Sequence, residues 1–295
     1  MTTKILIDRR MNLLGSIWMV AAMAIFAIED AFVKAASTTL SVSQILIIFG
    51  LGGAAVFAGL ARFNSEPLFV QDVMSRPMRI RVVFEIVGRL FYVLAITLTP
   101  LSASTVILQA TPLVVVAGAA LFFGEKVGWR RWFAIFVGLI GVVIIIQPGT
   151  DSFSVLSILA IVGMFGFAGR DLASRAAPAT LSTNILGFYG FLSIVVAGGV
   201  FSIWEGVTFL FPDIETSYYL LGAILAGVGA YSCLMKAMRT GEISAVTPFR
   251  YTRLLFGISL GVVLFGEQLS SAMVLGSSMI VFSGLFILWR GKSAG

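Results

Sequence analysis

Histidine is absent from this sequence of 295 residues, and cysteine occurs once, at Cys233. Without imidazole groups the sequence cannot supply histidine metal ligands, a Ser-His-Asp triad or a histidine proton relay. The lone cysteine has no partner for a disulfide within the sequence. The serine-rich stretch Leu101–Thr105 has no base beside it, so it does not form a nucleophile motif. These absences argue against a membrane enzyme, and we expect no catalytic activity, no metal site and no cofactor.

Charged residues are also scarce, because they make up 12% of the sequence whereas hydrophobic residues make up 59%. A soluble fold cannot bury so much apolar surface, but a bilayer can accommodate it. A helix crosses the hydrocarbon with about 20 mostly apolar residues. Windows of this kind lie at 12–36, 41–61, 77–98, 102–124, 130–147, 153–176, 182–203, 216–236, 244–266 and 270–290. They are too long and too continuously apolar for barrel strands. We therefore predict an all-α membrane protein with ten transmembrane helices.

The net charge of +6 is distributed unevenly along the predicted topology. Ten spans place both termini on one side, and the connections on that side include the basic segments Lys4–Arg10, Arg62–Arg81, Lys126–Arg131 and Arg290–Lys292. The connections on the other side carry acidic residues, namely Asp151, Glu205, Asp213, Glu215 and Glu267. Basic loops stay in the cytoplasm. We therefore expect both termini to be cytoplasmic in a bacterial inner membrane, and no nucleic-acid partner.

The sequence also contains an internal repeat. Three segments recur at a nearly constant spacing: Leu101–Thr105 as Ile243–Thr247, Phe122–Lys126 as Leu264–Gln268, and Ala27–Ala36 as Ala168–Ala177. Five spans per repeat is an odd number, so the second repeat must enter the membrane inverted. We predict two inverted five-helix repeats, residues 1–148 and 149–295, with a substrate site near the midplane between them.

Two short patterns carry a resemblance to a known family. Ser-Ala-x-Thr opens the fourth and ninth spans, and Phe-Gly-Glu closes both. With the five-plus-five duplication, these features resemble the EamA branch of the drug/metabolite transporter superfamily, and within it the YddG-type amino-acid exporters. The resemblance covers the whole chain. It implies a ten-helix carrier that moves small metabolites by alternating access, often outward, and it leaves the substrate open.

Charged residues inside the spans are the strongest functional signal, because a charge at membrane depth is costly unless it is paired or hydrated. Three acid–base pairs have i,i+4 spacing: Asp30/Lys34, Glu85/Arg89 and Asp171/Arg175. Such residues are neighbours on a helix, so each pair can neutralise itself. The first and third pairs also occupy equivalent turns of the two repeats. We expect these two pairs to belong to opposite gates; the alternative is that they are static intrahelical pairs.

Candidate substrate contacts lie nearer the middle of the predicted bundle. Arg89 is the deepest arginine and could bind a substrate carboxylate through two hydrogen bonds. Arg250 could do the same or reach the headgroups, whereas we expect Arg253 to extend to the cytoplasmic headgroups. The remaining candidate cavity residues are Glu85, Tyr92, Gln109, Thr111, Tyr231 and Tyr251.

Each of these residues also has a purely structural interpretation. Gln109 and Thr111 precede Pro112, so they could simply belong to a helix kink. The tyrosines could be core or lipid-facing residues. Glu125 and Glu267 close the fourth and ninth spans, and we expect them to make helix-end or loop contacts rather than to carry protons.

The sequence therefore favours a secondary transporter over an enzyme or a scaffold, since a scaffold would need sizeable loops to bind partners. Amino acids, including aromatic and neutral ones, are the expected exported substrates, with protons as a candidate coupling ion. Uptake of a vitamin or a sulfonium-type metabolite is the alternative.

Overall fold

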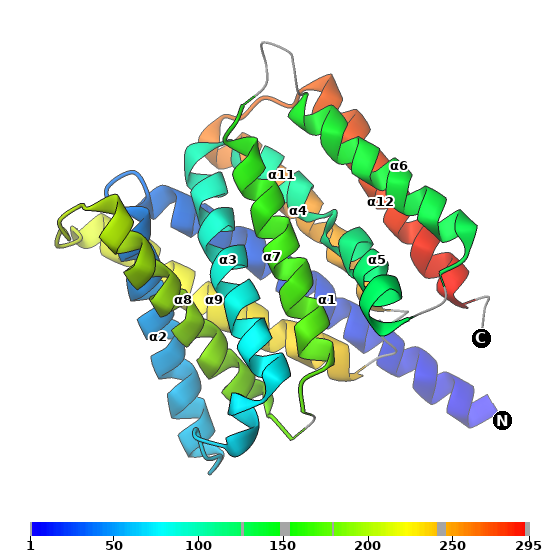
Figure 1. Ribbon diagram of the computed structural model, residues 1–295, viewed down its shortest axis with the longest axis horizontal. Coiled ribbons are helices and arrows are strands. Elements are labelled where there is room, and N and C mark those ends of the chain that lie inside the picture. The colour runs from blue at the N-terminus through cyan, green and yellow to red at the C-terminus, as the bar shows by residue number, and fades with distance from the viewer. Residues whose placement is uncertain (1, 125–126, 148–153, 179, 241–245, 293–295) are drawn as a thin grey trace.

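A computed structural model gives the fold, and it describes residues 2–124, 127–147, 154–178, 180–240 and 246–292. These residues form an all-helical bundle (Figure 1). The helices of the first half are α1 Thr2–Ala36, α2 Val42–Phe63, α3 Arg76–Leu98, α4 Leu101–Leu108, α5 Thr111–Phe123 and α6 Trp129–Ile146, with a short 3-10 helix η1 Gln71–Met74. Those of the second half are α7 Ser157–Arg175, α8 Thr183–Glu205, α9 Ile214–Thr240, η2 Thr247–Tyr251, α11 Thr252–Phe265 and α12 Ser271–Lys292.

The ten predicted spans are confirmed, with the fourth built from α4 and α5 and the ninth from η2 and α11. Six helical segments are long and apolar enough to cross a membrane by themselves: Arg10–Ala36, Val42–Phe63, Leu101–Phe123, Ser157–Ser174, Thr183–Glu205 and Ile214–Ala237. Trp132–Ile146 and Ser271–Ile287 are shorter apolar helices. The beginning of α1 and the end of α12 lie at the same end of the bundle (Figure 1), as an even number of crossings requires.

The fourth span breaks at the predicted kink. Pro112 has no N–H to donate to the carbonyl of Leu108, so that acceptor is freed. The Thr111 hydroxyl takes its place and donates to the Leu108 carbonyl at 2.5 Å. Thr111 therefore stabilises the break between α4 and α5, which is the structural role that the proline predicted.

The packing between the halves includes five pairs of spans, each with one member from either half. The pairs are α1 with α9, α2 with α8, α3 with α7, α6 with α12, and α4 with α11. Numbered in chain order, span 1 packs with span 8, span 2 with span 7, span 3 with span 6, span 4 with span 9, and span 5 with span 10. Exchanging each span for its equivalent in the other half returns the same set of pairs. This is the pattern that a two-fold axis between two five-helix repeats produces.

Glycines allow the closest crossings between the halves. A methyl group added at Gly166 of α7 would overlap the Gly88 backbone of α3. On the other side of the bundle, a Cβ at Gly141 of α6 would lie 2.7 Å from the Gly276 carbonyl of α12. Small residues at such crossings let helix backbones approach in lipid, where helix packing rather than hydrophobic exclusion holds the bundle together.

Candidate functional site

The interior of the bundle contains charged side chains that are almost completely buried. Glu29 and Asp30 on α1 are each 1% exposed, and Arg81, Glu85 and Arg89 on α3 are also buried. In a membrane such groups persist only with partners. Their partners come mainly from other helices and form three groups, described in turn.

The central cluster consists of Glu29, Asp30, Arg89, Tyr92 and Arg253. Arg89 of α3 donates to Oε1 of Glu29 on α1. The neighbouring Asp30 accepts from Arg253 of α11 at 2.6 Å and from the Tyr92 hydroxyl at 2.9 Å, both at Oδ2. The cluster therefore links spans one, three and nine, and so joins the two halves.

Aromatic rings enclose the two arginines of the central cluster. The Arg89 guanidinium lies 4.5 Å from the ring centroid of Phe49 on α2. The Arg253 guanidinium lies 5.1 Å from the ring of Phe26 and 5.6 Å from that of Tyr92. An arginine over an aromatic face gains electrostatic attraction, and more so where water is excluded. The rings thus stabilise both guanidinium groups inside the bundle, where the groups are largely buried from water.

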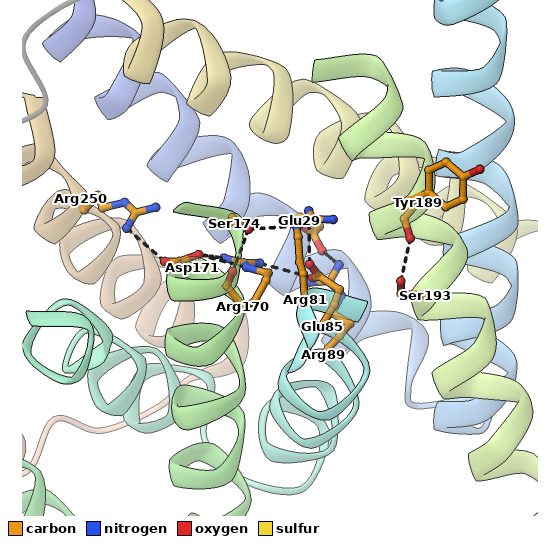
Figure 2. Close-up of polar contacts among 10 residues, drawn as sticks. All are labelled: Glu29, Arg81, Glu85, Arg89, Arg170, Asp171, Ser174, Tyr189, Ser193 and Arg250. Atoms are coloured by element: carbon orange, nitrogen blue, oxygen red, sulfur yellow. Dashed lines mark hydrogen bonds and ion pairs between the residues drawn. The ribbon is translucent and has the colours of Figure 1, made fainter. Parts of the chain in front are cut away.

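The second group is an ion-pair chain that runs from η2 through α7 to α3 (Figure 2). Arg250 is 3.4 Å from Asp171, and Asp171 accepts from its neighbour Arg170 at 2.8 Å. Arg170 in turn is 3.4 Å from Glu85, which is 3.7 Å from Arg81. The chain alternates basic and acidic groups from both halves.

The third group, the Lys34–Glu267 clasp, holds α1, α3, α4 and the α11–α12 connection together. Glu267 accepts from the backbone N–H groups of Leu101 and Ser102 at 2.6 and 2.9 Å, and from the Ser102 hydroxyl at 2.6 Å. These are the free N–H groups at the start of α4, where a carboxylate is favourable. Lys34 lies 3.6 Å from the same carboxylate. The expected helix-end contact of Glu267 is confirmed, whereas Glu125 lies outside the described residues.

Two of the expected i,i+4 pairs are wrong. Lys34 donates to the carbonyls of Ile96 and Thr99 at 3.0 and 2.8 Å, at the end of α3, whereas Asp30 binds Arg253. A lysine is favourable there because the last carbonyls of a helix lack intrahelical donors. Glu85 and Arg89 likewise separate, since Arg89 binds Glu29 of α1. Spacing along one helix shows which side chains can meet, but neighbouring helices offered closer partners. The Arg175 side chain lies outside the described residues, so the Asp171/Arg175 pair stays a prediction.

The expectation that Arg253 reaches the headgroups is also wrong. Its side chain is 13% exposed and its guanidinium is directed at Asp30. The sequence places Arg253 near the start of the ninth span, but η2 and α11 pass against α1 at the height of Asp30. Asp30 thus gives the Arg253 guanidinium a counter-charge inside the bundle.

The structure brings some predicted cavity residues together and places others elsewhere. Arg89 and Tyr92 belong to the central cluster, and Glu85 and Arg250 to the ion-pair chain. Gln109 and Thr111 lie at the α4–α5 break. The other two predicted tyrosines pack against neighbouring helices. Tyr231 packs edge-on against Phe57 of α2, and the Tyr251 ring fits against Gly284 of α12.

Sequence reasoning missed three members of these groups, Glu29, Arg81 and Arg170, and it assigned Arg253 to the headgroups. Each of the three lies in a predicted span, so the cost of charge at membrane depth applied to each of them. The i,i+4 pattern drew attention to their neighbours instead. A search for every charge in a span, without that pattern, finds all three.

Comparison with known proteins gives the family. The model of the EamA-like transporter family matches residues 13–147 and again residues 155–289. The chain belongs to this family. It is therefore a multi-pass membrane transporter, and the two matches cover nearly all of its ten spans.

Individual relatives of this EamA-like protein carry different substrate names. It is 26% identical to a riboflavin transporter of Vibrio cholerae over 95% of both chains. It is 23% identical to an S-adenosylmethionine uptake transporter of Rickettsia prowazekii, over 95% of this chain and 94% of that one. It is 27% identical to the pseudopaline exporter CntI of Pseudomonas aeruginosa, over 94% and 96%. A solved crystal structure with 16% identity shares the fold, with a TM-score of 0.63 over 93% of this chain and 96% of that one.

Proposed function

We propose that this EamA-like protein is a secondary transporter that exports amino acids, including aromatic and neutral ones, by alternating access. The central cluster is the observation that supports this most strongly. It places carboxylate and guanidinium groups from both halves side by side at membrane depth. Such groups are costly there and mark substrate or ion pathways in membrane proteins. An amino acid presents the two complementary charges, a carboxylate and an ammonium group.

The balance of charges supports a ligand that carries a carboxylate. Among the described residues, the central cluster and the ion-pair chain contain five guanidinium groups and four carboxylates: Arg81, Arg89, Arg170, Arg250 and Arg253 against Glu29, Asp30, Glu85 and Asp171. One positive charge is therefore in excess. Arginine binds carboxylates through paired, charge-assisted hydrogen bonds. The guanidinium in excess favours the carboxylate end of a substrate, with Arg89 as the proposed contact.

Uptake of a vitamin or a sulfonium-type metabolite is the second candidate. It is supported by the relatives named as riboflavin and S-adenosylmethionine transporters, whereas the relative named as an exporter supports outward transport. Both candidates use the same fold and differ in the solute that the central cluster accepts.

Flux into liposomes distinguishes the candidates. We expect purified protein in liposomes loaded with unlabelled phenylalanine to exchange it for radiolabelled phenylalanine faster than protein-free liposomes do. Riboflavin and S-adenosylmethionine should compete weakly. Exchange needs no gradient, so it tests the substrate apart from the coupling ion. Exchange of radiolabelled S-adenosylmethionine or riboflavin by the same liposomes, with no phenylalanine exchange, would instead support the second candidate. A pH gradient across the same liposomes then tests protons as the coupling ion.

The orientation and the gates are also proposals. Charge asymmetry supports cytoplasmic termini in a bacterial inner membrane, and Asp30/Lys34 and Asp171/Arg175 remain the proposed gate residues. The Lys34–Glu267 clasp supports a gate at its end of the bundle, because it joins the two halves there. In this orientation that gate faces the periplasm.

Cysteine labelling tests the orientation. Asn64, in the α2–η1 connection, and Thr208, in the α8–α9 connection, are both exposed. In a Cys233→Ser background, a membrane-impermeant maleimide should label Thr208→Cys in intact cells. It should label Asn64→Cys only after lysis. The reverse pattern would invert the topology.

A further inference from the structure

Glu29 of the central cluster has one carboxylate oxygen without a partner. Its Oε1 accepts from Arg89, whereas its Oε2 is buried and makes no hydrogen bond to any described residue. The adjacent Asp30 shows the same arrangement, with Oδ2 bonded and Oδ1 buried without a partner in the described structure. A buried acceptor without a donor is destabilising, and more so when it is charged. Two such oxygens on successive residues point to a ligand that donates hydrogen bonds.

The same ion pair has an unused donor. Arg89 Nε is buried and has no acceptor among the described residues. The pair therefore presents a free donor on the guanidinium and a free acceptor on the carboxylate. A ligand that complements both carries a hydrogen-bond acceptor and a donor close together, and a negative acceptor with a positive donor gives the strongest bonds. An α-amino acid has these two groups on one carbon atom.

On its α2 and α9 side, Glu29 packs against uncharged neighbours. A Cβ built on Gly227 of α9 would lie 3.5 Å from Glu29 Cδ and 2.7 Å from the Phe49 ring. Gly227 thus removes a side chain that would press on the carboxylate and on the ring. The charged groups that act on Glu29 are Arg89, Asp30 and Arg253. On the α2 and α9 side the neighbours described here are Phe49 and Gly227.

We propose that the Glu29–Arg89 pair is the recognition site for the α-ammonium and α-carboxylate groups of the substrate. This inference rests on the proposed transport of amino acids. The substrate carboxylate replaces Glu29 on Arg89, and the substrate ammonium replaces Arg89 on Glu29. The unpartnered oxygen of Asp30 lies next along α1 as a further acceptor for the ammonium.

Charge balance explains why a zwitterion suits this site. Separating the pair around a zwitterion leaves each protein charge with an opposite charge, so no buried charge is left unpaired. A carboxylate alone would leave Glu29 without a counter-charge, and an amine alone would leave Arg89 without one. Losing one partner of a buried pair is strongly destabilising. The site therefore selects zwitterions over monoacids and over amines.

Competition by phenylalanine and three of its analogues tests this selectivity. The probes are L-phenylalanine, 3-phenylpropionate, which lacks the ammonium, 2-phenylethylamine, which lacks the carboxylate, and N-acetylphenylalanine, whose nitrogen carries no charge. Each competes with radiolabelled phenylalanine exchange in liposomes. In the wild type, phenylalanine should compete at concentrations at least about tenfold lower than any of the other three, since a desolvated charge pair is worth that much or more.

Glu29→Gln identifies the residue that binds the ammonium. It should weaken inhibition by phenylalanine at least about tenfold but strengthen inhibition by 3-phenylpropionate, because a neutral residue 29 no longer leaves a buried charge unpaired when a monoacid binds Arg89. Glu29→Asp, which keeps the charge, should retain the preference for phenylalanine. Glu205→Gln is the matched control, since Glu205 bonds Ser43 at the end of α8, away from the central cluster; its analogue profile should stay that of the wild type.

The outcomes separate this inference from the proposed function. Wild-type protein that exchanges no amino acid overturns the proposed function. Wild-type protein that exchanges phenylalanine but is inhibited equally by 3-phenylpropionate overturns only the Glu29–Arg89 site. If Glu29→Gln weakens inhibition by phenylalanine and by 3-phenylpropionate equally, that result also overturns the Glu29–Arg89 site. If Glu29→Gln does not fold, the wild-type and Glu29→Asp profiles decide alone, and a Glu29→Asp profile without preference for phenylalanine contradicts the proposal.

Discussion

Arg89→Ala is expected to abolish amino-acid exchange completely. The substitution removes the guanidinium proposed to bind the substrate carboxylate, and it leaves Glu29 buried without its counter-charge. Removing one partner of a buried pair costs about 3–5 kcal/mol, so the variant should also unfold at lower temperature. Exchange of radiolabelled phenylalanine in liposomes and thermal unfolding in detergent measure the two effects.

A double variant separates transport from stability. Arg89→Ala/Glu29→Ala leaves neither charge unpaired, so much of the lost stability should return, because replacing both partners avoids an isolated buried charge. Exchange should remain absent, since neither substrate group has its partner. Normal exchange by Arg89→Ala, at the same amount of inserted protein, would remove Arg89 from the site. Arg62→Ala, in the exposed last turn of α2, serves as the matched arginine control.

Asp30→Ala is expected to destabilise the protein as strongly as Arg89→Ala does. Asp30 is 1% exposed and is the ion-pair partner of Arg253 from the other half. Without it, the guanidinium remains at membrane depth, which again costs about 3–5 kcal/mol. The Tyr92 hydroxyl also loses its acceptor. Thermal unfolding in detergent should show the loss.

The reciprocal variants test whether the pair acts as a unit. Arg253→Ala should destabilise about as much as Asp30→Ala, although its place in the sequence suggested a side chain at the interface. Asp30→Asn/Arg253→Gln keeps polar groups in place without charge and should be more stable than either single alanine variant. Additive losses in a double-mutant cycle would show that the two side chains do not depend on each other.

Sequence reasoning predicted the fold well because the bilayer leaves few solutions. Long apolar windows must be helices, and a repeat of five helices must be inverted. Pro112 likewise marked the break between α4 and α5, since the missing N–H is a local property of the chain. These features depend on one helix at a time, so no knowledge of the packing was needed.

The pairing of charges could not be predicted in the same way. Asp30 has Lys34 one turn away in sequence, yet its partner Arg253 is 223 residues distant. Which helix passes Asp30, and at what height, depends on glycine crossings and on the tilt of η2 and α11. The sequence showed that these charges needed partners, but only the packing showed which ones. Whether they bind substrate remains a proposal.

Arg250 and Arg253 have no equivalents in the first half of the chain, where the repeat places Leu108 and Thr111. Yet they hold Asp171 and Asp30, which are equivalent residues of the two halves. A carrier with identical halves would have inward-facing and outward-facing forms of equal free energy. Here a single span holds both aspartates. For the proposed alternating-access cycle we therefore expect an unequal resting equilibrium, in which each 1.4 kcal/mol of difference changes the ratio about tenfold. The apparent affinity for a substrate scales with the fraction of protein open to it, so the same solute would bind more tightly from one face of the membrane than from the other.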